Sequence, residues 1–196
     1  MIVFLLNKDV KILNVPWKLG IIDNCLKPDI ADYIRDNFPE TKNTRLKDFY
    51  QHAGPAKLND RIFHDFFLEN WTRRDELHLK AHEILNIPTP EDSVLSRWNY
   101  TYFPAGNPKE VVRDWHTDLE DKKLQFILYL GHNSRHTTFQ TEGIQMPFVH
   151  NRLIFWHATP YTSHRFFYCK TKRCTVNLTS QMNDSPTNFN GLEDYI

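Results

Sequence analysis

Cysteine, unbalanced charge and long apolar runs are all scarce in this 196-residue chain. The three cysteines, Cys25, Cys169 and Cys174, are odd in number and have no paired spacing, which argues against a disulfide framework and against a zinc ribbon. We expect reduced, structural thiols. Lysine plus arginine total 24 and aspartate plus glutamate total 24. No overall field therefore attracts a nucleic acid or an acidic membrane surface, which argues against both as partners.

Long apolar runs are the third absence. The longest stretches, Met1 to Leu6 and Phe126 to Leu130, fall far below the roughly 20 residues that a membrane-spanning helix needs. The start of the chain has no basic region before its apolar run and no small-residue cleavage site, so it predicts a first strand rather than a signal peptide. We expect a cytoplasmic protein without a membrane segment.

The length favours one domain over residues 1–196, and the pattern changes character near Pro88. Before it, Ile30 to Phe38 repeats apolar residues at helical spacing after Pro28, and a longer helical pattern runs from Asp60 to Ile87 with a break near residues 72–74. We expect strands and supporting helices over 1–92, a strand-rich core over 93–182 and an irregular tail over 183–196.

The core is predicted from short runs rich in β-branched and aromatic residues, which turn residues separate. The expected strands are Val94–Phe103, Lys123–Leu130, Thr137–Thr141, Gln145–Val149, Arg152–Trp156, Ser163–Tyr168 and Arg173–Ser180. Many short strands after a few helices predict a mostly β, α+β fold, in which a jelly roll carries helices on one face.

A His-x-Asp pattern, His116-Thr117-Asp118, directly precedes one of these strands. Residues two apart in an extended chain point the same way, so the imidazole and the carboxylate can reach one point. Two histidines and one carboxylate on one face of an octahedron leave the other face for substrate and O2, as in non-haem Fe(II) oxygenases. His164 is the predicted third ligand, because it opens a strand that can pair with the one containing Arg173. His157 is the alternative.

Arg173 and Thr175 form the second predicted group. An arginine one strand after His164 can line the same cavity and bind a carboxylate through both arms of its guanidinium group. Thr175 points to the same side, and its hydroxyl can bind the same carboxylate.

In order, the chain shows Tyr102-Phe103-Pro104-Ala105-Gly106, His116-x-Asp118, an apolar strand ending in Tyr129-Leu130, Thr138-Phe139, His164 and Arg173-x-Thr175. This order resembles the double-stranded β-helix superfamily of Fe(II)- and 2-oxoglutarate-dependent oxygenases, and most of all its prolyl-4-hydroxylase-like branch. That branch usually has lysine where this chain has Arg173, and Gly-Gly in place of Arg135-His136, which leaves the substrate class open.

The resemblance implies a cupin-like double-stranded β-helix and a dioxygenase that uses Fe(II), 2-oxoglutarate and O2. It implies hydroxylation of an unactivated C–H bond in a protein side chain or a small molecule, with release of succinate and CO2. Arg173 and Tyr102 would hold the distal carboxylate of 2-oxoglutarate. Substrate selectivity would lie in Tyr50–Lys57, Pro104–Arg113 and the tail after Gln181.

Two other classes stay open. One is a cupin-like metal-binding module without oxygenase activity, against which the spacing of Arg173-x-Thr175 from His164 argues. The other is a zinc hydrolase at the same ligands, for which no general-base carboxylate is in place. His78 and His82, four residues apart on a predicted helix, are interpreted as a surface or packed pair because no acidic residue lies between them.

Overall fold

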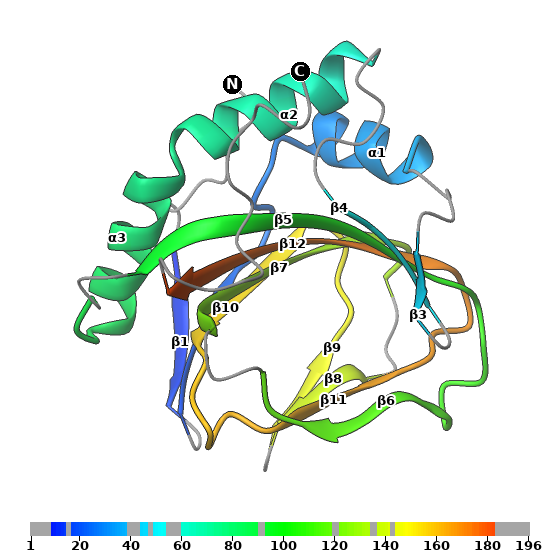
Figure 1. The fold of residues 1–196 in the computed structure, drawn as a ribbon. Helices are drawn as coiled ribbons and strands as arrows, with labels where there is room; N and C mark the ends of the chain where they lie inside the picture. The colour runs from blue at the N-terminus through cyan, green and yellow to red at the C-terminus, as the bar shows by residue number, and fades with distance from the viewer. Residues whose placement is uncertain are drawn as a thin grey trace.

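The computed structural model describes residues 9–14, 17–38, 44–46, 49–53, 60–89, 93–118, 122–133, 137–141 and 144–182. Their strands form two antiparallel sheets that face one another, and the three helices cover the outer side of the larger sheet (Figure 1). The eight-stranded sheet has the order β1 (Lys11–Asn14), β2 (Lys18–Ile22), β10 (Arg152–His157), β7 (Lys122–Gly131), β12 (Arg173–Met182), β5 (Ser93–Phe103), β4 (Phe49–Ala53) and β3 (Thr44–Leu46). The four-stranded sheet has the order β6 (Val111–His116), β11 (His164–Phe167), β8 (Thr137–Thr141) and β9 (Ile144–Pro147).

The helices begin and end where their flanking residues dictate. Helix α1 (Pro28–Asp36) begins with a proline, whose fixed φ suits the first helical turn. Helix α2 (Arg61–Thr72) is capped by Asp60, whose carboxylate accepts hydrogen bonds from the backbone N–H groups of Ile62 (3.0 Å) and Phe63 (3.3 Å). Helix α3 (Arg74–Leu85) follows after the single residue Arg73 and ends at Asn86, which has a positive φ of 49°. The predicted break near residues 72–74 is confirmed.

The helix-facing side of the larger sheet is apolar. Alternate residues of its central strands pack against side chains of all three helices; on the sheet these are Trp98, Tyr100, Leu124, Phe126, Leu128, Leu130, Leu153, Phe155, Cys174, Val176 and Leu178. Fully burying one such aliphatic or aromatic side chain contributes about 1.5–3 kcal/mol to folding. This layer therefore supplies most of the apolar stabilisation of the fold.

The inner side of the same sheet is more polar, because the alternate residues of β12 and β5 face the smaller sheet. It carries the buried residues Asn99, Thr101, Gln125, Arg173, Thr175 and Thr179. Two hydrogen bonds join strands here, from Asn177 Nδ2 to Thr101 Oγ1 (2.7 Å) and from Thr179 Oγ1 to Gln125 Oε1 (2.9 Å). Buried polar groups are costly unless they are paired or bind a ligand, so this face is the place to look for a site.

All seven strands predicted from the sequence are present, with ends that differ by at most a few residues. The predicted pairing of the strand that His164 opens with the strand of Arg173 is wrong: β11 pairs with β6 and β8, whereas β12 pairs with β5 and β7 in the other sheet. Two segments predicted as loops are partly strand. Residues 50–53 pair with β5, and residues 111–113 pair with β11. Both strands are short and lie where tertiary pairing outweighs weak local preference. The strand predicted at the start of the chain and the tail after residue 182 lie almost wholly outside the described residues.

Two predictions from the scarce features can be compared with the structure. Cys25, Cys169 and Cys174 are buried, and none of them forms a disulfide with another described residue. In the part of the chain that the structure describes, no helix combines the length and apolar character that crossing a membrane requires.

Candidate functional site

His116 and His164 lie side by side in the smaller sheet. The two residues are direct partners in the antiparallel register of β6 and β11, and their ring centroids are 4.3 Å apart. Each ring places Nδ1 next to the backbone carbonyl oxygen two residues earlier, that of Asp114 at 2.7 Å and that of Thr162 at 3.0 Å. Because a carbonyl only accepts, Nδ1 carries the proton in both rings and Nε2 presents a lone pair. This is the tautomer that binds a metal through Nε2.

Nε2 of His116 is buried and has no hydrogen-bond partner among the described residues. Burial, followed by the neighbouring His164, lowers the pKa of His116 to about 4, so the ring is neutral at neutral pH. An orphaned, buried lone pair beside a second imidazole is the arrangement that a metal ion would complete.

Asp118 follows two residues after β6 and lines a cavity of about 460 Å³. Its charge acts on the His116 imidazole and on Arg113, so the carboxylate lies near the histidine pair. Among the described residues, no three His, Cys, Asp or Glu side chains are arranged closely enough to hold a metal ion as they stand. The set His116, Asp118 and His164 therefore stays a prediction.

Arg173 is the most deeply buried cation on the inner face, with 1% of its surface exposed. Its Cζ lies 4.1 Å from the ring centroid of Phe103, 5.7 Å from that of Phe166 and 5.9 Å from that of Phe148. Burial lowers its pKa, but a guanidinium group stays charged at neutral pH. A cation that has lost this much hydration is a strong site for an anionic ligand.

Thr175 and Tyr129 extend the surface around Arg173. Thr175 is 3% exposed, lies on the same face of β12, and is the register partner of Tyr129 on β7. Tyr129 is fully buried, stacks on Phe148 with centroids 4.8 Å apart, and is close enough to act on the charge of Arg173. The two hydroxyl groups thus belong to the same end of the inner face as the guanidinium group.

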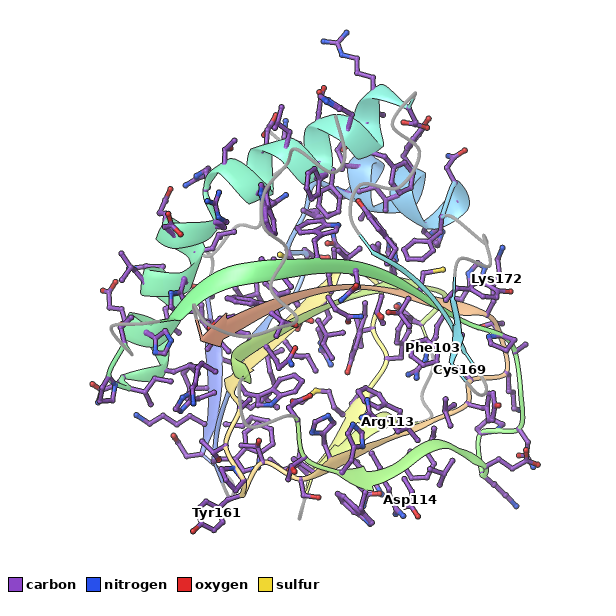
Figure 2. All side chains as sticks on the ribbon, in the orientation of Figure 1. Phe103, Arg113, Asp114, Tyr161, Cys169 and Lys172 are labelled. Atoms are coloured by element: carbon purple, nitrogen blue, oxygen red, sulfur yellow. The ribbon has the colours of Figure 1, made fainter. Side chains whose placement is uncertain are left out.

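The ring of Phe166 connects the histidine pair with Arg173. Its centroid is 5.5 Å from that of His164, 6.0 Å from that of His116 and 5.7 Å from Cζ of Arg173. In Figure 2, Phe103 lies at the inner side of the larger sheet, above the smaller sheet that carries the histidines. One small molecule could therefore reach both the imidazoles and the guanidinium group.

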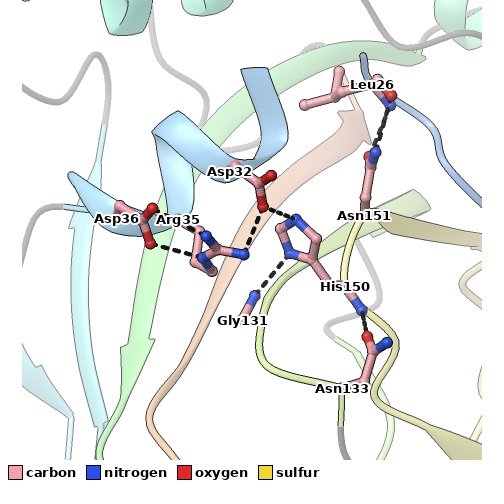
Figure 3. A network of polar contacts seen from close by, with 8 residues as sticks. All are labelled: Leu26, Asp32, Arg35, Asp36, Gly131, Asn133, His150 and Asn151. Atoms are coloured by element: carbon pink, nitrogen blue, oxygen red, sulfur yellow. Dashed lines mark hydrogen bonds and ion pairs between the residues drawn. The ribbon is translucent and has the colours of Figure 1, made fainter. Parts of the chain in front are cut away.

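A network of polar contacts holds the end of β7 at Gly131, which lies next to Arg173 on β12. The N–H of Gly131, the register partner of Arg173, donates to Nδ1 of His150 (3.1 Å), and Nε2 of His150 lies 3.2 Å from Oδ1 of Asp32 on α1 (Figure 3). Asp32 also binds Arg35 (2.6 Å). Burial lowers the pKa of His150, which keeps Nδ1 able to accept. Helix α1 is thereby tied to the end of β7 beside the arginine.

Two residues weighed in the sequence analysis lie elsewhere. Tyr102 packs against the helix-facing cluster, so it is on the opposite side of the sheet from Arg173. His157 ends β10 in the larger sheet, and its ring contacts that of His82 on α3, with centroids 5.9 Å apart. The side chains of Thr138 and Phe139 lie outside the described residues.

His78 and His82 are packed rather than exposed. They are 4% and 1% exposed, and their Nε2 atoms are 3.1 Å apart. Ser180 Oγ lies 3.3 Å from Nε2 of His78. The packed interpretation of this pair is confirmed.

Sequence reasoning missed the aromatic surroundings of the site and the hydroxyl of Tyr129. Trp156 packs edge-on to His164, with centroids 5.3 Å apart, and Phe103 and Phe148 flank Arg173. Alternation along β7 could have found Tyr129, because Lys123, Gln125, Ile127 and Tyr129 share one face.

Comparison with solved structures agrees with this architecture. A prolyl-4-hydroxylase from Pseudomonas putida superposes with a TM-score of 0.57 and 14% identity, covering 84% of this chain and 92% of its own. The chain has the fold of the 2-oxoglutarate- and Fe(II)-dependent oxygenases. A Trichoplax adhaerens prolyl hydroxylase in complex with a hypoxia inducible factor peptide gives 0.58 and 11%, covering 84% and 83%. A Burkholderia pseudomallei oxidoreductase of the 2OG-Fe(II) oxygenase family gives 0.56 and 11%, covering 83% and 84%.

These likenesses confirm the predicted oxygenase fold, a double-stranded β-helix with helices on one face. They also match the prolyl-4-hydroxylase-like branch that the sequence resembles. No protein-family model matches the chain, and no curated protein matches its sequence.

Proposed function

We propose that this protein is an Fe(II)- and 2-oxoglutarate-dependent dioxygenase that hydroxylates an unactivated C–H bond. The observation that carries the proposal is the position of His116 directly opposite His164, with both rings in the tautomer that binds a metal. The ring of Phe166 lies close to both the ring of His164 and the guanidinium group of the buried Arg173. An oxygenase fold alone leaves the chemistry open, whereas this combination is the one that a ferrous ion and an oxo-acid would use.

His116, Asp118 and His164 would hold the iron. The donor set fits, because two neutral imidazoles and one carboxylate suit Fe(II) and leave coordination positions open. Bound iron and 2-oxoglutarate would supply the oxidising power, with O2 consumed and succinate and CO2 released. The protein itself fixes the histidine tautomers through the carbonyl groups of Asp114 and Thr162.

Arg173 and Thr175 would bind the distal carboxylate of 2-oxoglutarate. The guanidinium fork matches a carboxylate geometrically, and the surrounding rings of Phe103, Phe148 and Phe166 exclude water and strengthen the ion pair. Tyr129 replaces Tyr102 as the tyrosine at this end of the site, because it shares the inner face with Thr175.

His164 is preferred to His157 as the third ligand for a geometric reason. It lies directly opposite His116 on the neighbouring strand, whereas the ring of His157 packs toward α3. Either a small molecule or a protein side chain fits the proposal as substrate, and the peptide complex of the Trichoplax adhaerens relative is an example of the second. The balanced charge of the chain argues against nucleic acid.

Anaerobic titration of the full chain with Fe(II) and then 2-oxoglutarate tests the proposal through the weak visible charge-transfer band. Succinate release in air should require Fe(II) and should fail with zinc. His116→Ala, Asp118→Ala and His164→Ala should each lose the band and the release of succinate. His157→Ala, the matched control, should keep both. No band and no succinate from the wild type would contradict the proposal, and metal loss only in His157→Ala would reassign the third ligand.

A further inference from the structure

Gly131 ends β7 and is packed between two parts of the proposed co-substrate site. It is the register partner of Arg173 on β12. A Cβ atom added to Gly131 would lie 3.0 Å from Cε1 of Phe148 and 3.5 Å from Cα of Arg173. Phe148 in turn flanks the guanidinium group of Arg173 and stacks on Tyr129. The backbone of Gly131 therefore sets how closely the ring of Phe148 approaches β12.

The side chain of His150 holds Gly131 in this position. The pairing of β10 with β7 ends at Arg152 and Tyr129, two residues before Gly131. Nδ1 of His150 accepts a hydrogen bond from the N–H of Gly131 (3.1 Å), and the N–H of His150 donates to Oδ1 of Asn133 (2.7 Å) (Figure 3). The imidazole thus takes the place of the next backbone acceptor on this side of β7.

The ring of His150 can hold Gly131 only while it is neutral. Because Nδ1 accepts, the proton of the neutral ring is on Nε2, which lies 3.2 Å from Oδ1 of Asp32 on α1. A second proton would turn Nδ1 into a donor that faces the N–H of Gly131, and the hydrogen bond would be lost. The charged ring would be attracted to the carboxylate of Asp32 instead.

The charged groups around His150 come from α1. Arg35 binds Asp32 (2.6 Å) and Asp36 (2.7 Å), and all three act on the imidazole. His132, at the end of β7, acts on Asp36. Burial, followed by Arg35, lowers the pKa of His150 from 6.5, against the opposite effect of the two carboxylates. The ring is therefore neutral at neutral pH and gains its second proton in acid.

We propose that His150 is a positioning residue for the co-substrate, because it holds the end of β7 at Gly131 and so keeps Phe148 against Arg173. This inference rests on the proposed function, since it takes Arg173 as the anchor of 2-oxoglutarate. His150 acts through Gly131 and Phe148 rather than on the ligand itself. The hydrogen bond is present above the pKa of the ring and is lost as the pH falls through it, so binding of 2-oxoglutarate weakens in acid.

The first test measures the dissociation constant of 2-oxoglutarate between pH 8 and pH 5, by anaerobic titration of the full chain at saturating Fe(II). His150→Asn places an amide oxygen near the position of Nδ1 and gains no proton in this range. His150→Leu removes the acceptor. His132→Asn, an exposed histidine beside the same turn, is the matched control.

Acid also weakens metal binding through His116 and His164 in every variant. The ratio of two dissociation constants at one pH, rather than either constant alone, therefore reports on His150. We expect His150→Asn to bind within about twofold of wild type at pH 8 and about three- to fivefold more tightly than wild type at pH 5.

Loss of the acceptor should show in the other variant. His150→Leu should bind about three- to fivefold more weakly than wild type at pH 8 and should approach wild type at pH 5. The ratio of wild type to His132→Asn should stay constant. A ratio of wild type to His150→Asn that does not change with pH would overturn the inference, and so would equal binding by wild type and His150→Leu at pH 8.

A second measurement needs neither iron nor 2-oxoglutarate. In the 15N-labelled full chain, the amide resonance of Gly131 should shift between pH 8 and pH 5 in wild type and stay fixed in His150→Asn. The same spectra show that the variants are folded. Equal movement of this resonance in both proteins would overturn the inference even where 2-oxoglutarate binds. Absent binding of 2-oxoglutarate by wild type at pH 8 is instead a failure of the proposed function.

Discussion

The two faces of strand β12 differ in character, one apolar and the other polar. One face carries Cys174, Val176 and Leu178, which join the cluster under the helices. The other carries Arg173, Thr175, Asn177 and Thr179, which face the smaller sheet. One face of this strand therefore contributes to the stability of the fold, and the other face contributes to the proposed chemistry. The two faces differ because successive side chains of a strand point to opposite sides.

The helix-facing side works by close packing. Its side chains are almost all fully buried and touch residues from distant parts of the chain, so each deletion leaves a cavity. The inner side buries polar groups that can bind a ligand. Their desolvation costs free energy, which the packing of the apolar side must offset. This division predicts that substitutions on one face change unfolding and those on the other change binding.

Leu178→Ala should give the largest effect on the apolar face. Leu178 is fully buried in the cluster under the helices, and its truncation should lower the free energy of unfolding by about 2–5 kcal/mol. Urea unfolding followed by circular dichroism measures this. The affinity of the folded fraction for 2-oxoglutarate should stay within about twofold of wild type. A loss of less than about 1 kcal/mol would show that the helix layer does not depend on this cluster.

Arg173→Gln should give the largest effect on the polar face. Loss of the guanidinium group should weaken 2-oxoglutarate binding by about a hundredfold, because a buried ion pair with a carboxylate is removed. The free energy of unfolding should fall by no more than about 1 kcal/mol, since a costly buried cation also disappears. Anaerobic titration and urea unfolding of the same sample give both numbers. Arg173→Lys, the charge-retaining control, should recover part of the affinity. Equal affinity of wild type and Arg173→Gln would remove Arg173 from the site.

Acid should destabilise the helix-facing side through His82. Burial, followed by His78 and His157, lowers the pKa of His82 from 6.5 to about 4 in the fold. The unfolded chain therefore binds a proton at higher pH than the native chain, so stability is full above pH 6.5 and falls as the pH drops toward 4. The loss due to His82 should be about 2–3 kcal/mol. His82 also faces His157, and His78 lies between it and Ser180.

Urea midpoints measured across this pH range check the acid prediction. His82→Gln should show a shallower fall in stability between pH 6.5 and pH 4 than wild type, because it has no proton to gain. His64→Gln, on the exposed side of α2, is the matched control and should follow wild type. Parallel curves for wild type and His82→Gln would refute the role of His82.

The smallest effect should distinguish two tyrosines that lie on opposite faces of the larger sheet. Tyr129→Phe should weaken 2-oxoglutarate binding by about two- to tenfold, because one hydroxyl near Arg173 and Thr175 is lost. Tyr102→Phe should leave binding unchanged, because Tyr102 packs on the helix-facing side. The same anaerobic titration serves for both. The reverse order would place Tyr102 in the site, as the sequence resemblance suggested.

Much of the fold followed from local patterns. Alternating β-branched and aromatic residues located β5, β7 and β12, and helical spacing located α1, α2 and α3, because these patterns depend on residues close in sequence. The first residues of β6, up to Arg113, were predicted as part of a loop, and so was most of β4. Their pairing with β11 and β5 is long-range, and no local pattern encodes it.

The candidate site divides in the same way. The sequence by itself determined that His116 and Asp118 can turn to one side, and that Arg173 and Thr175 share a face, because side-chain direction repeats every two residues in a strand. Only the tertiary structure decided that His164 lies opposite His116, that His157 turns toward α3, and that Tyr129 rather than Tyr102 accompanies Arg173. Those outcomes depend on strand order and register. Pairing between segments that are distant in the sequence sets both, so no short stretch of sequence encodes them.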